Sequence, residues 1–181
     1  MSYAKKDLSN DSIYQEFLQL VDLQSMLDYY AIQVYIGNVD LKDDKNTLVW
    51  RTRDQENDTY GDGKWRFSLF DLENSSALYI QENLLPDYCS LNNILSQNAL
   101  FASAMKNSEF NRLFYQTIED IRTHNFSPKR VSETLNDIYT KWDPYMEDFY
   151  RRFGNKNNWR VSSIQNLEDY FIDRYNRYRY C

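Results

Sequence analysis

Glycine and proline constrain this chain most, because there are so few of them. The 181 residues include four Gly and three Pro. Sandwiches and barrels of short strands need turn residues at regular intervals, so this scarcity favours a helical body. At this length we expect one domain, residues 1–181, with a substantial hydrophobic core. Aromatic residues make up 17% of the chain, so that core should be rich in rings.

The apolar pattern predicts a helix over residues 12–20 and another over residues 23–36. Asp22 is placed to cap the second helix, and Gly37 to end it in the left-handed conformation. Two strand-like runs follow, joined by a polar connection typical of a hairpin. The runs are residues 47–52 and 64–70. Residues 77–97 are expected to be irregular. After them we expect a helix over residues 99–106 and another that Ser108 caps. A further helix should begin at Pro128 and break at Pro144, the next should end at Gly154, and the last should cover residues 163–180.

Charge and the supply of His and Cys exclude several classes of function. Lys and Arg total 21 against 27 Asp and Glu, and a net charge of −6 disfavours non-specific nucleic-acid binding. A single His removes Ser-His-Asp chemistry and His-based zinc sites. Cys89 and Cys181 are expected to stay unpaired. No run is apolar enough to span a membrane, and residues 1–11 are polar, without a leader pattern.

The segment YIGNVDLKDDKN, residues 35–46, interrupts the chain between the second predicted helix and the first strand. A second acidic loop, DLENSS, follows the second strand, so two acidic loops flank the hairpin and each begins with an Asp. An EF-hand would need Gly at its sixth position and Glu at its twelfth, where Lys45 and Arg51 stand. A solvated acidic turn is the simpler alternative for either loop.

Protein kinases place a catalytic Asp after a helix, then an Asn, then a strand pair that ends at a metal-binding Asp. Asp40, Asn46 and Asp71 follow that order here. Phosphoryl transfer needs a carboxylate to orient the attacking hydroxyl and accept its proton, and oxygen ligands to hold Mg²⁺ against the phosphates. Loops at the ends of rigid strands can converge on one pocket. We therefore expect the carboxylates of Asp40 and Asp71 to face a common cleft.

A family resemblance rests on the same residues. GNVD followed by an Asn, and then GKWRFSLFDLE, resembles the spore coat protein H (CotH) kinase family. FASAMKNSEFNRLFYQTIEDIRTHNFSPKRVSETLNDI resembles that family's helical region, so the resemblance covers most of residues 20–177. It implies an α+β, mainly α fold: the C-terminal lobe of an atypical protein kinase, with a β-hairpin flanked by helices. It also implies ATP and Mg²⁺ (or Mn²⁺) as cofactors and Ser or Thr of a secreted, surface, spore-coat or cellulosomal protein as substrate.

The resemblance also implies roles for individual residues. Asp40 would be the catalytic Asp, and Lys42 would neutralise transferring phosphate oxygens, with a plain surface lysine as the equal alternative. Asn46 and Asp71 would bind the metal and through it the nucleotide. Glu73 stands where the family usually has a second Asp, and it is the third candidate ligand.

One departure from the kinase pattern is large. The 39 residues before Asp40 are mainly helical with one Gly, so they do not form the N-terminal lobe that supplies a phosphate-binding Lys and a Gly-rich cover. The resemblance implies that this lobe is absent from residues 1–181 and packs on them in the intact protein. Because positioning is most of phosphoryl-transfer catalysis, residues 1–181 alone are expected to be weak or inactive. The rival function is a non-catalytic scaffold or protein-binding module of an extracellular assembly.

Overall fold

The structure is a computed structural model that describes residues 6–54, 56, 58–76, 90–153 and 160–178. Residues 1–75 with 89–121 form one compact unit, and residues 76–88 with 122–181 form a second. Each unit is treated by itself below, and the single domain stays a prediction. Cys89, Cys181 and the first part of the stretch expected to be irregular lie outside the described residues.

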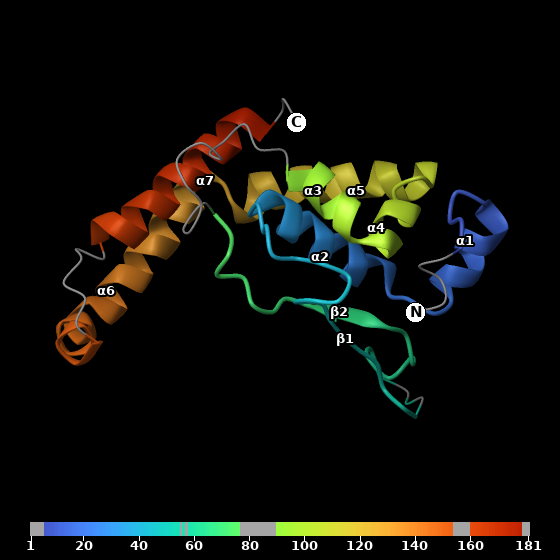
Figure 1. The fold of residues 1–181 in the computed structure, drawn as a ribbon, viewed down its shortest axis with the longest axis horizontal. Coiled ribbons are helices and arrows are strands. Elements are labelled where there is room, and N and C mark those ends of the chain that lie inside the picture. Colours follow the sequence, from blue (N-terminus) through green and yellow to red (C-terminus); the bar gives the residue numbers. More distant parts are fainter. Residues whose placement is uncertain (1–5, 55, 57, 77–89, 154–159, 179–181) are drawn as a thin grey trace. The chain divides into compact units, whose positions relative to one another are not determined.

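The fold is α+β and mainly α, as predicted (Figure 1). In chain order the elements are α1 (Asp11–Leu18), α2 (Leu23–Tyr35), β1 (Leu48–Trp50), β2 (Arg66–Ser68), α3 (Ser90–Gln97), α4 (Ala99–Ala104), α5 (Ser108–Asp120), the π-helical turn η3 (Ile121–Asn125), α6 (Pro128–Phe153), a second π-helical turn η4 (Arg160–Gln165) and α7 (Asn166–Arg177). No helix of the described residues has the length and apolarity to cross a bilayer.

Helix α2 is the centre of the first unit. It lies between the hairpin on one side and α3, α4 and α5 on the other (Figure 1). Most of its side chains are therefore buried, which agrees with the broad apolar stripe in its sequence. Asp22 caps it as predicted, since its carboxylate accepts the Ser25 N–H at 3.0 Å.

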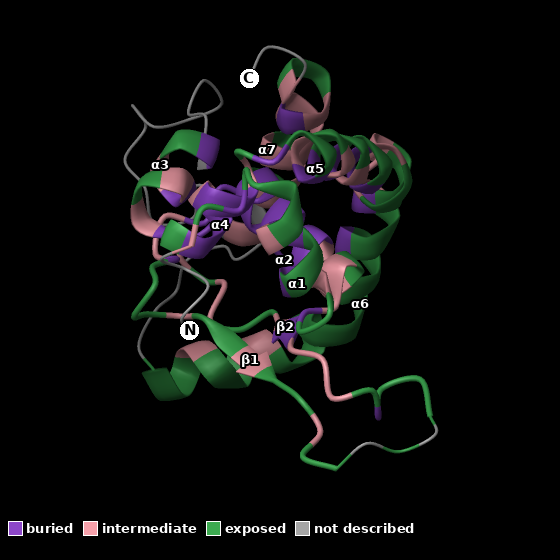
Figure 2. Ribbon diagram, turned by 90° about the vertical axis from the view of Figure 1, so that its right-hand side faces the viewer, coloured by how far each residue is buried: buried purple, intermediate pink, exposed green. Residues whose placement is uncertain are grey.

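The hairpin packs on α2 through one strand. β1 and β2 are antiparallel, with Val49 opposite Phe67. β2 is largely buried while β1 is largely exposed, so the hairpin turns β2 toward α2 (Figure 2). The Phe67 N–H donates to Ser25 Oγ at 2.9 Å, and the Phe67 ring lies 5.3 Å from Tyr29 and 5.7 Å from Tyr30 between ring centroids. Each strand is three residues long, shorter than predicted, because the ladder ends at the pairs Leu48–Ser68 and Trp50–Arg66, and Trp65 pairs with Val21 instead.

Aromatic rings join α2 to α4 and α5. Phe101 of α4 is fully buried and stacks on Tyr30 with centroids 4.2 Å apart. On its other side it meets the edges of Phe114 at 5.1 Å and Phe110 at 6.2 Å. The expectation of a ring-rich core is confirmed here.

Two predicted boundaries in the first unit are wrong. Residues 90–97, expected to be irregular, form α3, because Leu91 and Ile94 bury one face of a short helix despite its polar residues. Helix α5 begins at Ser108, but its cap is Asn107, whose Oδ1 accepts the N–H groups of Glu109 and Phe110 at 3.0 and 3.2 Å. Asn107 is favoured as the cap because its amide also donates to the Leu8 carbonyl at 3.2 Å.

The second unit pairs α6 with η4 and α7. The predicted break at Pro144 is wrong, since α6 runs unbroken from Pro128 to Phe153 with Pro144 inside it. Proline removes one helical hydrogen bond. Residues 140–145 are exposed, and half-buried residues resume at Met146 and Tyr150, so the helical pattern continues past the proline. Phe126 stacks on Phe171 with centroids 4.9 Å apart, which ties the start of α6 to α7.

Candidate active site

The end of α2 fixes where the first acidic loop begins. Gly37 has φ 65°, the left-handed conformation predicted for it. Its N–H donates to the Val34 carbonyl at 3.2 Å, and the Asn38 N–H donates to the Gln33 carbonyl at 3.1 Å. These two bonds are the Schellman motif, which satisfies the last carbonyls of a helix and turns the chain away from its axis.

Asn38 then carries the geometry of the helix end to Asp40. The Asn38 side chain is fully buried, and its amide donates to Gln33 Oε1 at 2.8 Å. Its own Oδ1 accepts the Asp40 N–H at 2.9 Å. Because Gln33 is also fully buried, the Asp40 backbone is held by a bridge that water does not compete for.

The Asp40 carboxylate has one occupied oxygen and one open oxygen. Oδ2 accepts from Lys45 Nζ at 2.5 Å and from the amides of Asn46 and Asn74, each at 3.2 Å. No donor within the described residues bonds to Oδ1. The hydrogen bond from Lys45 is the largest cause that holds the pKa of Asp40 below its ordinary value. Asp40 is therefore ionised at neutral pH, with one oxygen available to a hydroxyl.

The two acidic loops are joined at their backbones. The Val39 N–H donates to the Asn74 carbonyl at 3.2 Å, so the loop that follows α2 lies against the loop that follows β2. Tyr29 of α2 donates from its hydroxyl to the Asn46 carbonyl at 3.2 Å. These bonds bring residues 34 positions apart in sequence to one carboxylate, that of Asp40.

Two of the predicted metal ligands, Asn46 and Asp71, have an unusual backbone conformation. Asn46 has φ 60° and Asp71 has φ 58°. Non-glycine residues rarely adopt this left-handed conformation, although Asn and Asp tolerate it best. Such residues are concentrated at functional sites, where the surrounding structure holds them in place. The observation supports a function for both loops beyond solvation.

Lys45 was not predicted as a site residue, and its ammonium joins the loops electrostatically. The hydrogen bond to Asp40 is the first cause that raises the pKa of Lys45, and the charges of Asp71 and Glu73 add to it. Within the described residues, the carboxylates of Asp71 and Glu73 have no hydrogen bond or ion pair. Lys45 thus contacts Asp40 and is attracted by the charges of Asp71 and Glu73, whose carboxylates are open to a second cation.

Of the predicted site residues, Asp40 contacts this ammonium, Asn46 contacts Asp40, and Asp71 and Glu73 act on the ammonium through their charge. Lys42 is different: its side chain is exposed, and its backbone pairs with that of Lys45 through N–H to carbonyl bonds of 3.1 and 3.2 Å. It acts on Asp40 only as the smallest of the causes that lower the carboxyl pKa. Which of these residues are catalytic stays a prediction. Asn74 was also missed, because a polar loop gives no sign of which Asn turns inward.

The residues fit a divalent cation by their chemistry. Carboxylate and amide oxygens are the ligands that Mg²⁺ and Mn²⁺ take, and a cationic group already lies among them. Within the described residues, no three His, Cys, Asp or Glu side chains converge closely enough to hold a metal by themselves. Mg²⁺ usually binds one or two carboxylates and completes its shell with water and phosphate.

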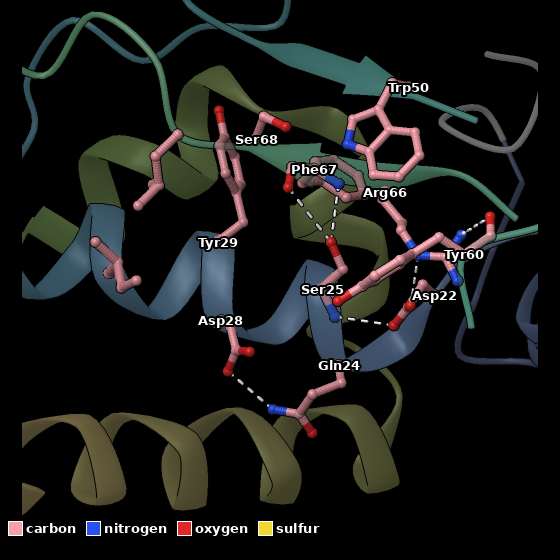
Figure 3. Close-up of a pocket in the computed structure, with 12 residues that line it drawn as sticks. Asp22, Gln24, Ser25, Asp28, Tyr29, Trp50, Tyr60, Arg66, Phe67 and Ser68 are labelled. Carbon is pink, nitrogen blue, oxygen red and sulfur yellow. Dashed lines mark hydrogen bonds and ion pairs between the residues drawn. The ribbon is translucent and has the colours of Figure 1, made fainter. Parts of the chain in front are cut away.

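A pocket of about 570 Å³ lies beside the site, between α2 and the hairpin (Figure 3). It contains none of the predicted site residues. Arg66 fastens one end of it: Nε lies 3.0 Å from Asp22 Oδ2, and its terminal nitrogens lie 2.9 and 3.0 Å from the Asp62 carboxylate. The Arg66 guanidinium also faces the rings of Trp50 and Tyr60. These contacts anchor the long hairpin connection to the start of α2, so the pocket wall is a structural clamp.

In chain order the site is built from a helix, a carboxylate loop, a hairpin and a second carboxylate loop. The family model described as CotH kinase protein matches residues 1–178, and the chain belongs to that family. Comparison with curated proteins gave no match, and neither did comparison with solved structures.

Proposed function

We propose that this chain is the catalytic lobe of an atypical protein kinase, which transfers the γ-phosphoryl group of ATP to a Ser or Thr hydroxyl of a protein. The observation that carries the proposal is the Asp40 carboxylate. It is ionised, held through Oδ2 by three donors, and open at Oδ1. Family membership supports a kinase-like function independently.

In this proposal Asp40 Oδ1 accepts a hydrogen bond from the substrate hydroxyl and turns its oxygen toward the γ-phosphorus. The new P–O bond forms to that oxygen as the bond to the bridging oxygen of ADP breaks, and the hydroxyl proton passes to Asp40. Because Asp40 has a lowered pKa, it is a weak base, so its main contribution is orientation. Correct orientation is most of what this reaction requires of a protein.

Asn46, Asp71 and Glu73 would hold the divalent cation. Asp71 and Glu73 have carboxylates without a partner in the described chain, and the Asn46 amide already bonds to Asp40, which would link the metal side of the site to the base. The bound ion supplies neutralisation of the phosphate charge. The Glu in place of the family's second Asp extends the carboxylate by one methylene, and we expect it to bind with a longer reach.

The nucleotide would need a second lobe above this one, and the hairpin offers a surface for it. Leu48, Trp50, Leu69 and Phe70 are 39 to 54% exposed, a cluster of large apolar side chains at the hairpin and its exit. Exposed apolar clusters of this kind are typical of surfaces that another body covers. We infer that the lysine-bearing N-terminal lobe packs here.

From the family we also infer a secreted or surface protein with a spore-coat or cellulosomal substrate. Cell fractionation would test the location.

The test is transfer of radiolabel from [γ-³²P]ATP to a Ser- and Thr-containing acceptor such as casein, with Mg²⁺ or Mn²⁺ and the whole protein. Asp40→Asn keeps the shape of the side chain and removes its charge. We expect it to lose about a hundredfold or more of the rate, the size of a general-base contribution. Asp44→Asn, the same change at an exposed carboxylate of the same loop, is the control and should keep most of the activity. A folded wild-type protein that transfers no label would favour the scaffold function instead.

A further inference from the structure

Lys45 lies where the two acidic loops meet. Its Nζ is 2.5 Å from Asp40 Oδ2, and its side chain is 53% exposed while that of Asp40 is 19% exposed. The lysine therefore reaches in from the surface to a carboxylate that is mostly covered. The charges of Asp71 and Glu73 act on the same ammonium. One monovalent cation thus contacts Asp40 and is attracted by the charges of the other two carboxylates to which the proposed function gives a role.

We propose that Lys45 is an internal counter-ion of this site, which competes with the divalent cation and moves to the nucleotide phosphate when ATP binds. The inference rests on the proposed function and deepens it, because it names the group that couples metal binding to nucleotide binding. Lys45 has this role and Lys42 does not, although the two lysines are three residues apart in one loop.

Competition follows from charge. An ammonium on Asp40 and a divalent cation at Asp71 and Glu73 repel each other, and each reduces the negative potential that attracts the other. With Lys45 on Asp40, the site has less affinity for a metal than its three carboxylates would otherwise give. The lysine also leaves no carboxylate charge at Asp40 uncompensated when the metal is absent.

Release of Lys45 follows from the shape of its side chain. Lysine is a compact charge on a flexible four-carbon stem, so its ammonium can change partner while its backbone stays in place. The Lys45 backbone is fixed by its paired bonds to Lys42, and the next residue is held by Tyr29. Phosphate oxygens offer the ammonium a doubly charged alternative to Asp40. Once it moves, Asp40 Oδ2 keeps the amides of Asn46 and Asn74 as donors, and the metal site loses its competitor.

Lys42 provides a matched comparison. It belongs to the same loop and has the same charge, but its side chain has no hydrogen bond or ion pair within the described residues. Of the groups that lower the Asp40 pKa, its charge has the smallest effect. Removing it changes the net charge of the chain equally, so any difference between the two variants reports position and not total charge.

The experiment is titration of residues 1–181 with Mn²⁺ in the absence of nucleotide, with free Mn²⁺ followed by electron paramagnetic resonance. We expect Lys45→Met to bind Mn²⁺ about tenfold more tightly than wild type, the effect of one nearby unit charge on a divalent ion. Lys45→Arg keeps the charge and should bind like wild type, while Lys42→Met should change the affinity less than about threefold. Adding Asp71→Asn to Lys45→Met should abolish the gain, which places the ion at this site.

Equal affinity of Lys45→Met and wild type would overturn the inference, as would an equal gain in both methionine variants. Absence of Mn²⁺ binding in Lys45→Met would also overturn it. None of these results depends on phosphoryl transfer, so the radiolabel assay judges the proposed function separately. Circular dichroism of each variant checks that the fold is unchanged.

Discussion

Asn38 gives the sharpest test of how the fold positions the site. It is fully buried and joins the end of α2 to Asp40 through bonds of 2.8 and 2.9 Å. Asn38→Ala removes both and leaves Gln33 Oε1, also buried, without its donor. A lost neutral hydrogen bond costs about 1 kcal/mol and a buried acceptor left unpaired about 1–3 kcal/mol, so we expect a loss of about 2–4 kcal/mol in the free energy of unfolding.

Urea denaturation followed by far-ultraviolet circular dichroism measures this loss. Asn92→Ala is the control, because Asn92 is an exposed residue of α3 with no hydrogen bond from its side chain in the described chain. It should stay within about 0.5 kcal/mol of wild type. If Asn38→Ala is as stable as Asn92→Ala, the bridge between α2 and Asp40 does not hold the loop, and the reasoning is wrong.

Three further predictions test the packing and the clamp. Phe101→Ala should lower the free energy of unfolding by about 3–5 kcal/mol, because Phe101 is fully buried among rings. Phe70→Ala, at an exposed ring, should change it by less than about 1 kcal/mol. Urea melts that give the two variants equal stability would contradict the core described here. Ser25→Ala should cost about 1–2 kcal/mol by leaving the Phe67 N–H without its acceptor, with Ser25→Thr as the variant that restores it. The Arg66 hydrogen bonds lower the pKa of Asp62 below 3.8. This ion pair therefore stabilises the fold at pH values above the ordinary Asp pKa, and the stabilisation is lost as the pH falls through the lowered pKa. NMR titration of Asp62 should show the low pKa, and Arg66→Met should return it toward 3.8.

The sequence predicted the parts of this fold that local chemistry determines. Asp22 and Gly37 bound α2 in the sequence and in the structure, because a cap and a left-handed glycine act on their own neighbours. The hairpin followed from alternation and β-branched residues. Pro144 was misread because a proline removes one helical hydrogen bond, which lowers the stability of a helix but does not have to end a long one.

The candidate site shows the same division. The order of Asp40, Asn46 and Asp71 is readable along the chain, and it predicted that their loops meet. Lys45 and Asn74 were missed because their roles depend on contacts between loops. The bond from the Val39 N–H to the Asn74 carbonyl places Asn74 beside Asp40, and the long flexible side chain of Lys45 lets its ammonium reach Asp40. Among several polar residues of one loop, the sequence does not say which turns inward.

The most direct measurement of the central claim is a crystal structure with Mn²⁺ and a non-hydrolysable ATP analogue. The account predicts anomalous density for manganese bounded by Asn46, Asp71 and Glu73, with the γ-phosphate directed at Asp40 and the Lys45 ammonium moved from Asp40 to a phosphate oxygen. Manganese bound away from Asp71, or a nucleotide bound on a face remote from Asp40, would contradict it.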